Sequence, residues 1–297
     1  MSRYVATAED EGHRTDAVIA KVSAQPRSRV TAAHREGRVL VNGTLAKPST
    51  PLHAGDVVEY AVELPAPLVV EAEELPLEIV HEDDDIIVVN KPAGMVTHPA
   101  HGAVDGTLVN ALLAHLPGLP GERTRAGLVH RLDRDTSGLL AIAKTPEALA
   151  TLGRAMKARY IEREYLALVT GIPADREGTI EGPLGRDPAN RLKYAIRAEG
   201  KPAVTHFRVR ERLRNAAELL LRLETGRTHQ IRVHLAAIGH PLVNDPLYGR
   251  SEARFSLPGQ ALHAWRLKLK HPRTKERLSF EVPPPAEYVA AKVLLTP

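Results

Sequence analysis

Apolar positions near the N-terminus follow first a helical and then a strand-like spacing, which predicts a small α+β module over residues 13–62. The predicted elements are a helix over 16–21, a second helix that begins near Arg29 after the candidate N-cap Ser28, a strand over 37–43 that closes in an Asn-Gly turn, and a strand over 57–60.

From residue 85 onward, strand and helix signals mix without regular alternation. The predicted elements are a buried strand over 85–90, a helix over 108–116, a helix over 147–156 that begins after Thr145-Pro146, strands over 165–169 and 219–223, and an amphipathic helix over 227–238 that stops at Gly239. These elements do not form the βαβ array of a doubly wound nucleotide-binding fold, and the pattern favours α+β as the fold class.

A proline-rich acidic stretch separates these two parts of the chain. Pro65, Pro67 and Pro76 lie in or beside residues 66–85, which contain 8 acidic and no basic residues. Proline and like charge both favour an extended, semi-rigid tether. We therefore predict three parts, namely an N-terminal domain over 1–64, a linker over 65–80 and a catalytic domain over 81–297.

The charge distribution points to a polyanionic partner. The net charge is only +4, but residues 86–297 contain 32 basic and 20 acidic residues, whereas residues 1–65 contain 8 of each. A basic main portion is typical of proteins that bind nucleic acid. With 297 residues and 43% apolar content, the chain is long enough to build a sizeable core.

The composition also limits the cellular compartments and the catalytic groups that are possible for this protein. The chain has no cysteine, which excludes disulfides and a cysteine nucleophile. No apolar run approaches 18 residues, and the N-terminus lacks the apolar core of a signal peptide. We expect a soluble cytoplasmic protein without a membrane segment, and a monomer.

The most informative stretch is residues 127–140, where Asp133 lies between Arg131 and Arg134 and is framed by apolar pairs. A neighbouring arginine favours the charged form of an aspartate and lowers its pKa, which keeps a carboxylate available as a nucleophile. Two other interpretations stay open at this point. The stretch is also typical of a solvated turn, and Asp135 would stand roughly 6–7 Å from Asp133 in an extended segment, a spacing that suits the carboxylate pair of a glycosidase.

The run from His130 to Asp133 and on to Gly138 resembles the active-site motif of the RluA-type pseudouridine synthases. Other segments resemble further motifs of that family, in the same order and spacing, over roughly residues 80–285: residues 90–94 with 97–99, 163–171, 185–187 with 200–205, and 225–234. The resemblance implies a pseudouridine synthase fold, with a mixed, mainly antiparallel, bifurcated sheet and an active cleft across its middle.

The N-terminal module resembles the S4 RNA-binding domain, through residues 28–29, 37–43, 47–49 and 55–56. One departure is Arg14-Thr15-Asp16, where that family has Arg-Leu-Asp. Between residues 21 and 47, Glu36 is the only acidic residue among several basic ones. This excess of positive charge predicts a positive surface for RNA. The candidate RNA-binding residues of this module are Arg27, Arg29, Arg35 and Arg38.

These resemblances imply that the chain isomerises uridine in RNA to pseudouridine, and its closest likeness is to the branch that acts on large-subunit (23S) ribosomal RNA. The base leaves its N-glycosidic bond, turns and rejoins through carbon 5, a reaction for which we expect no cofactor and no metal. The alternatives are a non-catalytic RNA-binding factor of ribosome assembly, and the same chemistry on tRNA.

Three side chains receive catalytic roles from the resemblance. Asp133 is the nucleophile, although the sequence leaves open whether it adds covalently or removes a ribose proton. Arg232 is expected to grip the Asp133 carboxylate through its planar guanidinium. Tyr165 is expected to stack on the target uracil and to help move the carbon 5 proton.

A wider set of basic residues is expected to hold the RNA. Arg131 is expected to fill the gap left when the uridine is extruded. The other candidate substrate-binding residues are Arg134, Arg227, Lys91, Arg186, Arg191 and Lys193. The histidines do not predict a metal site, because His229 and His234 are five residues apart, off the helical register of a metal-binding pair.

Overall fold

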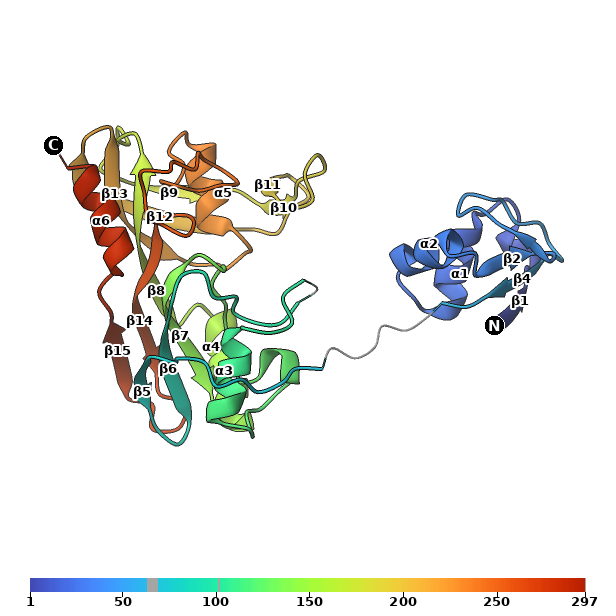
Figure 1. The fold of residues 1–297 in the computed structure, drawn as a ribbon, viewed down its shortest axis with the longest axis horizontal. Coiled ribbons are helices and arrows are strands. Elements are labelled where there is room, and N and C mark those ends of the chain that lie inside the picture. The colour runs from blue at the N-terminus through green and yellow to red at the C-terminus, as the bar shows by residue number, and fades with distance from the viewer. Residues whose placement is uncertain (63–68, 101, 297) are drawn as a thin grey trace. The chain divides into compact units, whose positions relative to one another are not determined.

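The computed structural model describes residues 1–62, 69–100 and 102–296, and divides the chain into two compact units, Met1–Leu68 and Val69–Pro297 (Figure 1). The first unit holds a four-stranded sheet in the order β1-β4-β2-β3 and two helices. Its elements are β1 (Ser2–Val5), η1 (Ala8–Asp10), α1 (Thr15–Ser23), α2 (Arg27–Arg35), β2 (Val39–Val41), β3 (Thr44–Leu45) and β4 (Val57–Tyr60).

The local predictions for this unit hold, except at the start of the second helix. Asn42 and Gly43 both have positive φ, as the predicted Asn-Gly hairpin turn requires. Helix α2 begins at Arg27 after Pro26, so Ser28 lies inside the first turn and is not the N-cap. Proline already supplies an extended conformation at the cap position, which starts the helix two residues early.

The second unit is built on a nine-stranded sheet, in the order β5-β6-β7-β14-β8-β13-β12-β9, with β15 paired to β14 (Figure 1). Among the described strand pairs only β14 and β7 run parallel. The strands are β5 (Ile79–Glu82), β6 (Ile86–Lys91), β7 (Ser137–Ala143), β8 (Glu162–Thr170), β9 (Glu177–Glu181), β12 (Val204–Leu213), β13 (Ala216–Leu223), β14 (Leu262–Lys270) and β15 (Arg277–Glu281), and a separate hairpin joins β10 (Leu184–Arg186) to β11 (Tyr194–Ile196).

The sheet branches at β14, as expected of a bifurcated sheet. The start of β14, at His263 and Ala264, pairs with β7, whereas residues 266–270 pair with β15, and β8 follows β14 on its other side. The sequence patterns predicted only β6, β8 and β13 of this unit, and they missed its other strands, β14 among them, and the C-terminal helix α6 (Ala286–Leu294). The mixed, mainly antiparallel α+β fold is confirmed.

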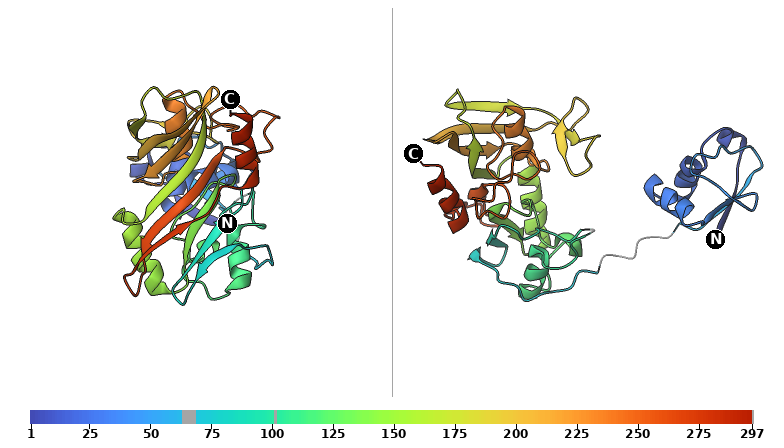
Figure 2. Two further views of the ribbon diagram at one scale, coloured as in Figure 1. Left: turned by 90° about the vertical axis from the view of Figure 1, so that its left-hand side faces the viewer. Right: turned by 45° about the horizontal axis from the view of Figure 1, so that its top comes forward.

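Helices cover both faces of this sheet. The other helices of the unit are α3 (Leu108–His115), η2 (Arg123–Arg125), α4 (Pro146–Lys157) and α5 (Gln230–Ala237). Along β8, Tyr165 and its alternate neighbours pack into one core with α3 and α5, whereas Leu166 and Leu168 pack with Tyr288 of α6 on the opposite face. Figures 1 and 2 show α5 and α6 against opposite faces of the sheet.

The start of α4 agrees with the sequence prediction, and the start of α5 does not. Thr107 and Thr145 accept hydrogen bonds from the backbone of the first turns of α3 and α4. Helix α5 begins at Gln230, three residues later than predicted. The Gln230 side chain accepts hydrogen bonds from Thr225 and from the backbone of Arg227, which fixes residues 225–229 as a loop.

Part of the predicted linker is a part of the second unit. Residues 65–68 lie outside the described residues, and residues 69–80 belong to the second unit. The Val70 carbonyl accepts a hydrogen bond from Arg123, and the Glu71 carbonyl accepts one from Asn110. The Glu73 carboxylate accepts one from the backbone of Gly106. These contacts tie the acidic stretch to the catalytic unit. In the described residues, no helix is long and apolar enough to cross a membrane.

Candidate active site

Asp133 lies on the loop that leads into β7, and the chain on either side of it is held in place. The Thr97 hydroxyl donates to the Leu132 carbonyl over 2.6 Å, and the Thr136 amide donates to the Asp133 carbonyl over 3.1 Å. Gln260 donates to the Thr136 hydroxyl over 3.0 Å. A loop whose backbone is fixed in this way presents its carboxylate in one position.

The parallel contact between β7 and β14 depends on a glycine. Gly138 has φ +111°, and a Cβ atom on it would lie 2.3 Å from the Ala264 carbonyl oxygen. Any other residue would push β14 away from β7 at the end of the catalytic loop. The Thr-Ser-Gly ending of the loop motif therefore sets where Asp133 stands relative to the centre of the sheet.

Three predicted catalytic residues meet in one pocket. Asp133 of the loop, Tyr165 of β8 and Arg232 of α5 all line it. Arg131 and Arg227, two of the predicted substrate-binding residues, line the same pocket. Residues from three distant parts of the sequence thus surround a half-buried carboxylate with cations and an aromatic ring. That arrangement suits a flipped, negatively charged nucleotide better than a neutral metabolite.

Arg232 approaches Asp133 but does not grip it in the predicted way. Its Nη1 atom lies 3.5 Å from Asp133 Oδ2, at the outer limit of a hydrogen bond. The bidentate contact is instead made with Asp245, whose two oxygens lie 2.7 and 2.8 Å from Nε and Nη2. The prediction of a bidentate grip on Asp133 is therefore wrong, because a second, fully buried carboxylate takes the fork of the guanidinium.

Asp245 was missed by sequence reasoning. It stands in an Asn-Asp-Pro run, which by composition only indicates a turn. Its carboxylate also accepts hydrogen bonds from the backbone of Leu247 and Tyr248, and the Tyr248 ring lies 5.1 Å from the Arg232 guanidinium. Burial acts to raise the pKa of Asp245, but the Arg232 contact outweighs it and holds this pKa below its ordinary value. Asp245 is thus ionised and fixes Arg232.

Tyr165 is 4% exposed and stays protonated at neutral pH. Burial raises the pKa of its hydroxyl, Arg163 acts in the opposite direction, and Asp133 adds to the rise. A protonated phenol can donate a hydrogen bond, and its ring offers an apolar face to a base. Both properties are compatible with the role that the resemblance gave it.

The two carboxylates of the loop do not work on one site. Asp135 pairs with Arg134, whose Nε lies 3.0 Å from Asp135 Oδ1, and Asp135 lines a different pocket from that of Asp133. A glycosidase needs both carboxylates on either side of one bond. The geometry therefore argues against the glycosidase interpretation. Arg134 is neutralised by Asp135 and lies outside the pocket of Asp133.

Comparison with known proteins assigns the family. Residues 85–237 match the family described as RNA pseudouridylate synthase, and residues 14–58 match the S4 domain. The chain belongs to the RNA pseudouridylate synthase family. The predicted family, enzyme class and S4 module are thereby confirmed.

The relatives of this synthase include bacterial and human proteins. It is 50% identical over 227 residues to ribosomal large subunit pseudouridine synthase D of Nitrosomonas europaea, covering 74% of this chain and 65% of that protein. It is 44% identical over 295 residues to the protein of the same name from Vibrio vulnificus, covering 94% and 89%. The structure of human RNA pseudouridylate synthase domain containing 1 superposes with a TM-score of 0.58 at 30% identity, covering 74% and 86%.

Lys91 does not contact substrate in this synthase, contrary to the prediction. It is 1% exposed, and its ammonium group donates to the carbonyls of Pro92, Met95 and Arg134 over 2.7 to 3.0 Å. Burial lowers its pKa to about 7, against the opposing effect of Asp135 and Asp133. With all three N–H groups in use, Lys91 cannot reach a phosphate. It fastens the catalytic loop at Arg134.

The other predicted RNA contacts from this unit lie on the β10–β11 hairpin, which projects from the sheet (Figure 1). Arg186 lies over the Tyr194 ring and donates to the Arg191 carbonyl over 2.7 Å. Lys193 lies 5.9 Å from the Tyr248 ring. The backbone N–H of Tyr194 donates to the Tyr248 hydroxyl over 2.8 Å, which connects the hairpin to the aromatic ring beside Arg232.

The arginines of the S4 unit are more strongly paired than their sequence spacing indicates. Arg27, which was predicted to contact RNA, makes two hydrogen bonds of 2.9 and 3.1 Å with the Asp16 carboxylate, and Arg14 makes two more. Arg38 pairs with Glu36. Arg35 is exposed and Arg29 is half-buried. Arg27 and Arg38 therefore present a charge that is partly neutralised.

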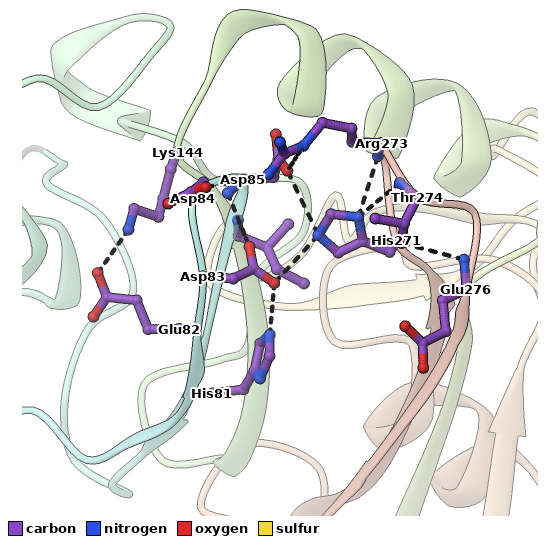
Figure 3. Close-up of polar contacts among 11 residues, drawn as sticks. His81, Glu82, Asp83, Asp84, Asp85, Lys144, His271, Arg273, Thr274 and Glu276 are labelled. Atoms are coloured by element: carbon purple, nitrogen blue, oxygen red, sulfur yellow. Dashed lines mark hydrogen bonds and ion pairs between the residues drawn. The ribbon is translucent and has the colours of Figure 1, made fainter.

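One group of described residues has the spacing of a metal site, close to the β5–β6 turn (Figure 3). The ligand atoms of Asp83, Asp85 and His271 lie within 4.8 Å of one another. His271 Nδ1, however, accepts hydrogen bonds from the backbone of Arg273 and Thr274, so Nε2 carries the ring proton and donates it to Asp83 over 3.2 Å.

The two carboxylates of this cluster already accept hydrogen bonds from other protein groups. Arg273 Nε donates to Asp85 over 2.6 Å, and Asp83 also accepts hydrogen bonds from His81 and from the backbone of Ile86 (Figure 3). A metal ion would require the lone pair of a deprotonated Nε2 and would displace Arg273. We therefore assign a structural role to this cluster, which holds the β5–β6 turn against the end of β14. The expected lack of a metal in the synthase stays a prediction.

Proposed function

We propose that this synthase isomerises uridines of large-subunit ribosomal RNA, with Asp133 as the nucleophile. The observation that carries the residue roles is the single pocket that contains Asp133, Tyr165 and Arg232. The choice of ribosomal RNA is supported by two relatives whose names specify the large ribosomal subunit, together with the S4 domain. Asp133 is 18% exposed in its side chain, which leaves the carboxylate accessible to a nucleotide.

The reaction rearranges bonds within one nucleotide. The bond from ribose C1′ to uracil N1 breaks, a bond from C1′ to C5 forms, the proton on C5 leaves, and N1 gains a proton. Asp133 acts on the ribose, and Arg232 holds that carboxylate oriented from 3.5 Å away. Tyr165 supports the detached uracil with its ring, and its hydroxyl relays a proton from C5 to N1, so that the phenol is protonated again at the end of the reaction. Arg131 and Arg227 offset the few kcal/mol that flipping the uridine costs.

The experiment is tritium release from a 23S-type transcript labelled at uridine carbon 5, beside a labelled tRNA pool. We expect release from the ribosomal transcript, no turnover by Asp133→Asn, and RNA binding by that variant similar to wild type. Asp135→Asn is the matched control, because its carboxylate lines another pocket, and it is expected to retain activity.

Other results would refute parts of this proposal. Release from tRNA alone would overturn the ribosomal substrate. Equal loss in Asp133→Asn and Asp135→Asn would overturn the assignment of the nucleophile. Tight RNA binding without release from either RNA would favour the assembly-factor alternative.

A further inference from the structure

Arg163 is a buried cation that forms no ion pair with a carboxylate of the described residues. It lies on β8, is 7% exposed, and its Nε atom has no hydrogen-bond partner in the structure. Among residues 1–62, 69–100 and 102–296, no carboxylate forms an ion pair with it. A buried charge that is unpaired costs several kcal/mol, so folded proteins normally pair such groups. An exception that persists beside an active site is a candidate for ligand binding.

The guanidinium of Arg163 stands between two pockets. Arg163 and Tyr165 are two residues apart on β8, so they share one face of the strand, and both line the pocket of Asp133. Arg163 also lines a second pocket, which shares Arg131, Gly226 and Arg227 with the first. We call this second pocket the flanking pocket, because it lies directly beside the catalytic one.

The flanking pocket is strongly basic. Its charged lining residues are Arg131, Lys157, Arg159, Arg163, Arg227 and Glu224. The one carboxylate among them, Glu224, is already paired with Arg159 and His206. The lining therefore carries an excess of positive charge that the described protein residues leave unbalanced.

A second buried donor in the same pocket lacks a partner. His130 Nε2 accepts a hydrogen bond from the Ala141 amide over 3.2 Å, so the ring proton is on Nδ1. Nδ1 is buried and has no partner. Burial, with Arg163 as the lesser cause, lowers the pKa of His130 to about 3, so the ring is neutral at pH 7. Two unpaired donors, one of them on a charged group, are thus available in this pocket for an acceptor from outside the described residues.

Gly226 makes room for the Arg163 head group. A Cβ atom on Gly226 would lie 2.7 Å from Arg163 Nη1. The φ angle of Gly226 lies outside the left-handed region, so its backbone conformation would accept other residues. The glycine is therefore explained by the space that the guanidinium occupies, and the loop of residues 225–229 is shaped around it.

We propose that Arg163, with His130 beside it, binds a backbone phosphodiester of the RNA strand next to the target uridine, and that the flanking pocket receives the adjoining nucleotide. This inference rests on the proposed function and identifies how the same site recognises its substrate. A phosphodiester supplies the negative charge and the several acceptor oxygens that the pocket lacks, and a guanidinium binds such oxygens in pairs.

The test compares Arg163→Met with wild type in the tritium-release assay on the 23S-type transcript. We expect KM to rise about 10- to 100-fold while kcat changes little, because a charge-assisted contact to the RNA backbone is lost. The slope of log(kcat/KM) against log[KCl] should become shallower by about 0.7 to 0.9, as for one phosphate contact. The melting temperature should not fall, because an unpaired buried charge has been removed.

Two further variants allow the proposal to be tested even if Arg163→Met does not fold. Gly226→Ala leaves Arg163 in the chain but crowds its guanidinium, and it should raise KM in the same direction. Arg176→Met removes an exposed arginine that lines neither pocket, and it should leave both KM and the salt slope unchanged.

The outcomes separate this inference from the proposed function. Wild-type enzyme that releases no tritium from the ribosomal transcript would refute the proposed substrate. Active wild type together with an unchanged KM and salt slope in Arg163→Met would overturn the phosphate site alone. A large fall in the melting temperature of Arg163→Met, with normal KM in Gly226→Ala, would also overturn it, since Arg163 would then stabilise the fold.

Discussion

Replacing Asp245 by asparagine tests whether Arg232 is anchored by this buried carboxylate. The wild-type pair has two contacts of 2.7 and 2.8 Å, with side chains 0% and 5% exposed. Asparagine keeps the size but removes the charge, and its amide N–H₂ would face the N–H groups of the guanidinium. Arg232 would then be a buried cation whose remaining carboxylate, Asp133, is 3.5 Å away.

The expected loss follows from that geometry. Removing one partner of a buried pair costs about 3–5 kcal/mol, because the other charge stays buried. For a unit of this size, each kcal/mol lowers the melting temperature by about 2–4 °C, so we expect a fall of about 6–20 °C. Asp133→Asn removes a longer contact to a partly exposed carboxylate and should cost at most about 1 kcal/mol. Asp245→Asn should also lower kcat by about 100-fold, because the orienting guanidinium is displaced.

The assay uses the single tryptophan of the chain, Trp265 on β14, whose fluorescence reports unfolding of the catalytic unit alone. Thermal unfolding midpoints of wild type, Asp245→Asn and Asp133→Asn are compared, and tritium release is measured with the same protein preparations. Equal midpoints for wild type and Asp245→Asn would refute the anchoring argument. So would a destabilisation by Asp133→Asn as large as that by Asp245→Asn.

Two further predictions concern carboxylates outside the pocket. Burial acts to raise the pKa of Asp83, but hydrogen bonds from His81 and the backbone lower this pKa to about 2. The ionised carboxylate therefore contributes about 1–2 kcal/mol to the free energy of unfolding above pH 4, and this contribution is lost as the pH falls through 2. Urea midpoints of wild type and Asp83→Asn should therefore differ at pH 7, approach each other below pH 4 and converge only near pH 2, and a constant difference would contradict this. Asp16→Asn should destabilise the S4 unit by about 1–3 kcal/mol, because Arg14 and Arg27 lose their shared carboxylate, and faster hydrogen exchange within residues 1–62 alone should reveal it.

The sequence alone determined the features that depend on a few neighbouring residues. The Asn-Gly turn, the start of α4 at Thr145-Pro146, and the α+β class follow from local hydrogen bonds and from apolar spacing. The motif around Asp133 identified the nucleophile candidate and the family, and Tyr165 and Arg232 were found through the same resemblance. These residues lie in contiguous runs, where identity and spacing carry the information.

Tertiary structure decided which charges meet. Arg232 was predicted to grip Asp133, which is 99 residues away in the sequence, but Asp245 occupies the guanidinium fork because it is buried against α5. Lys91 was predicted to face RNA, and its ammonium is instead enclosed by the carbonyls of Pro92, Met95 and Arg134. The sequence does not show whether a given charged side chain is solvated or buried. Its partner is chosen by the low-dielectric surroundings that only the packed sheet creates.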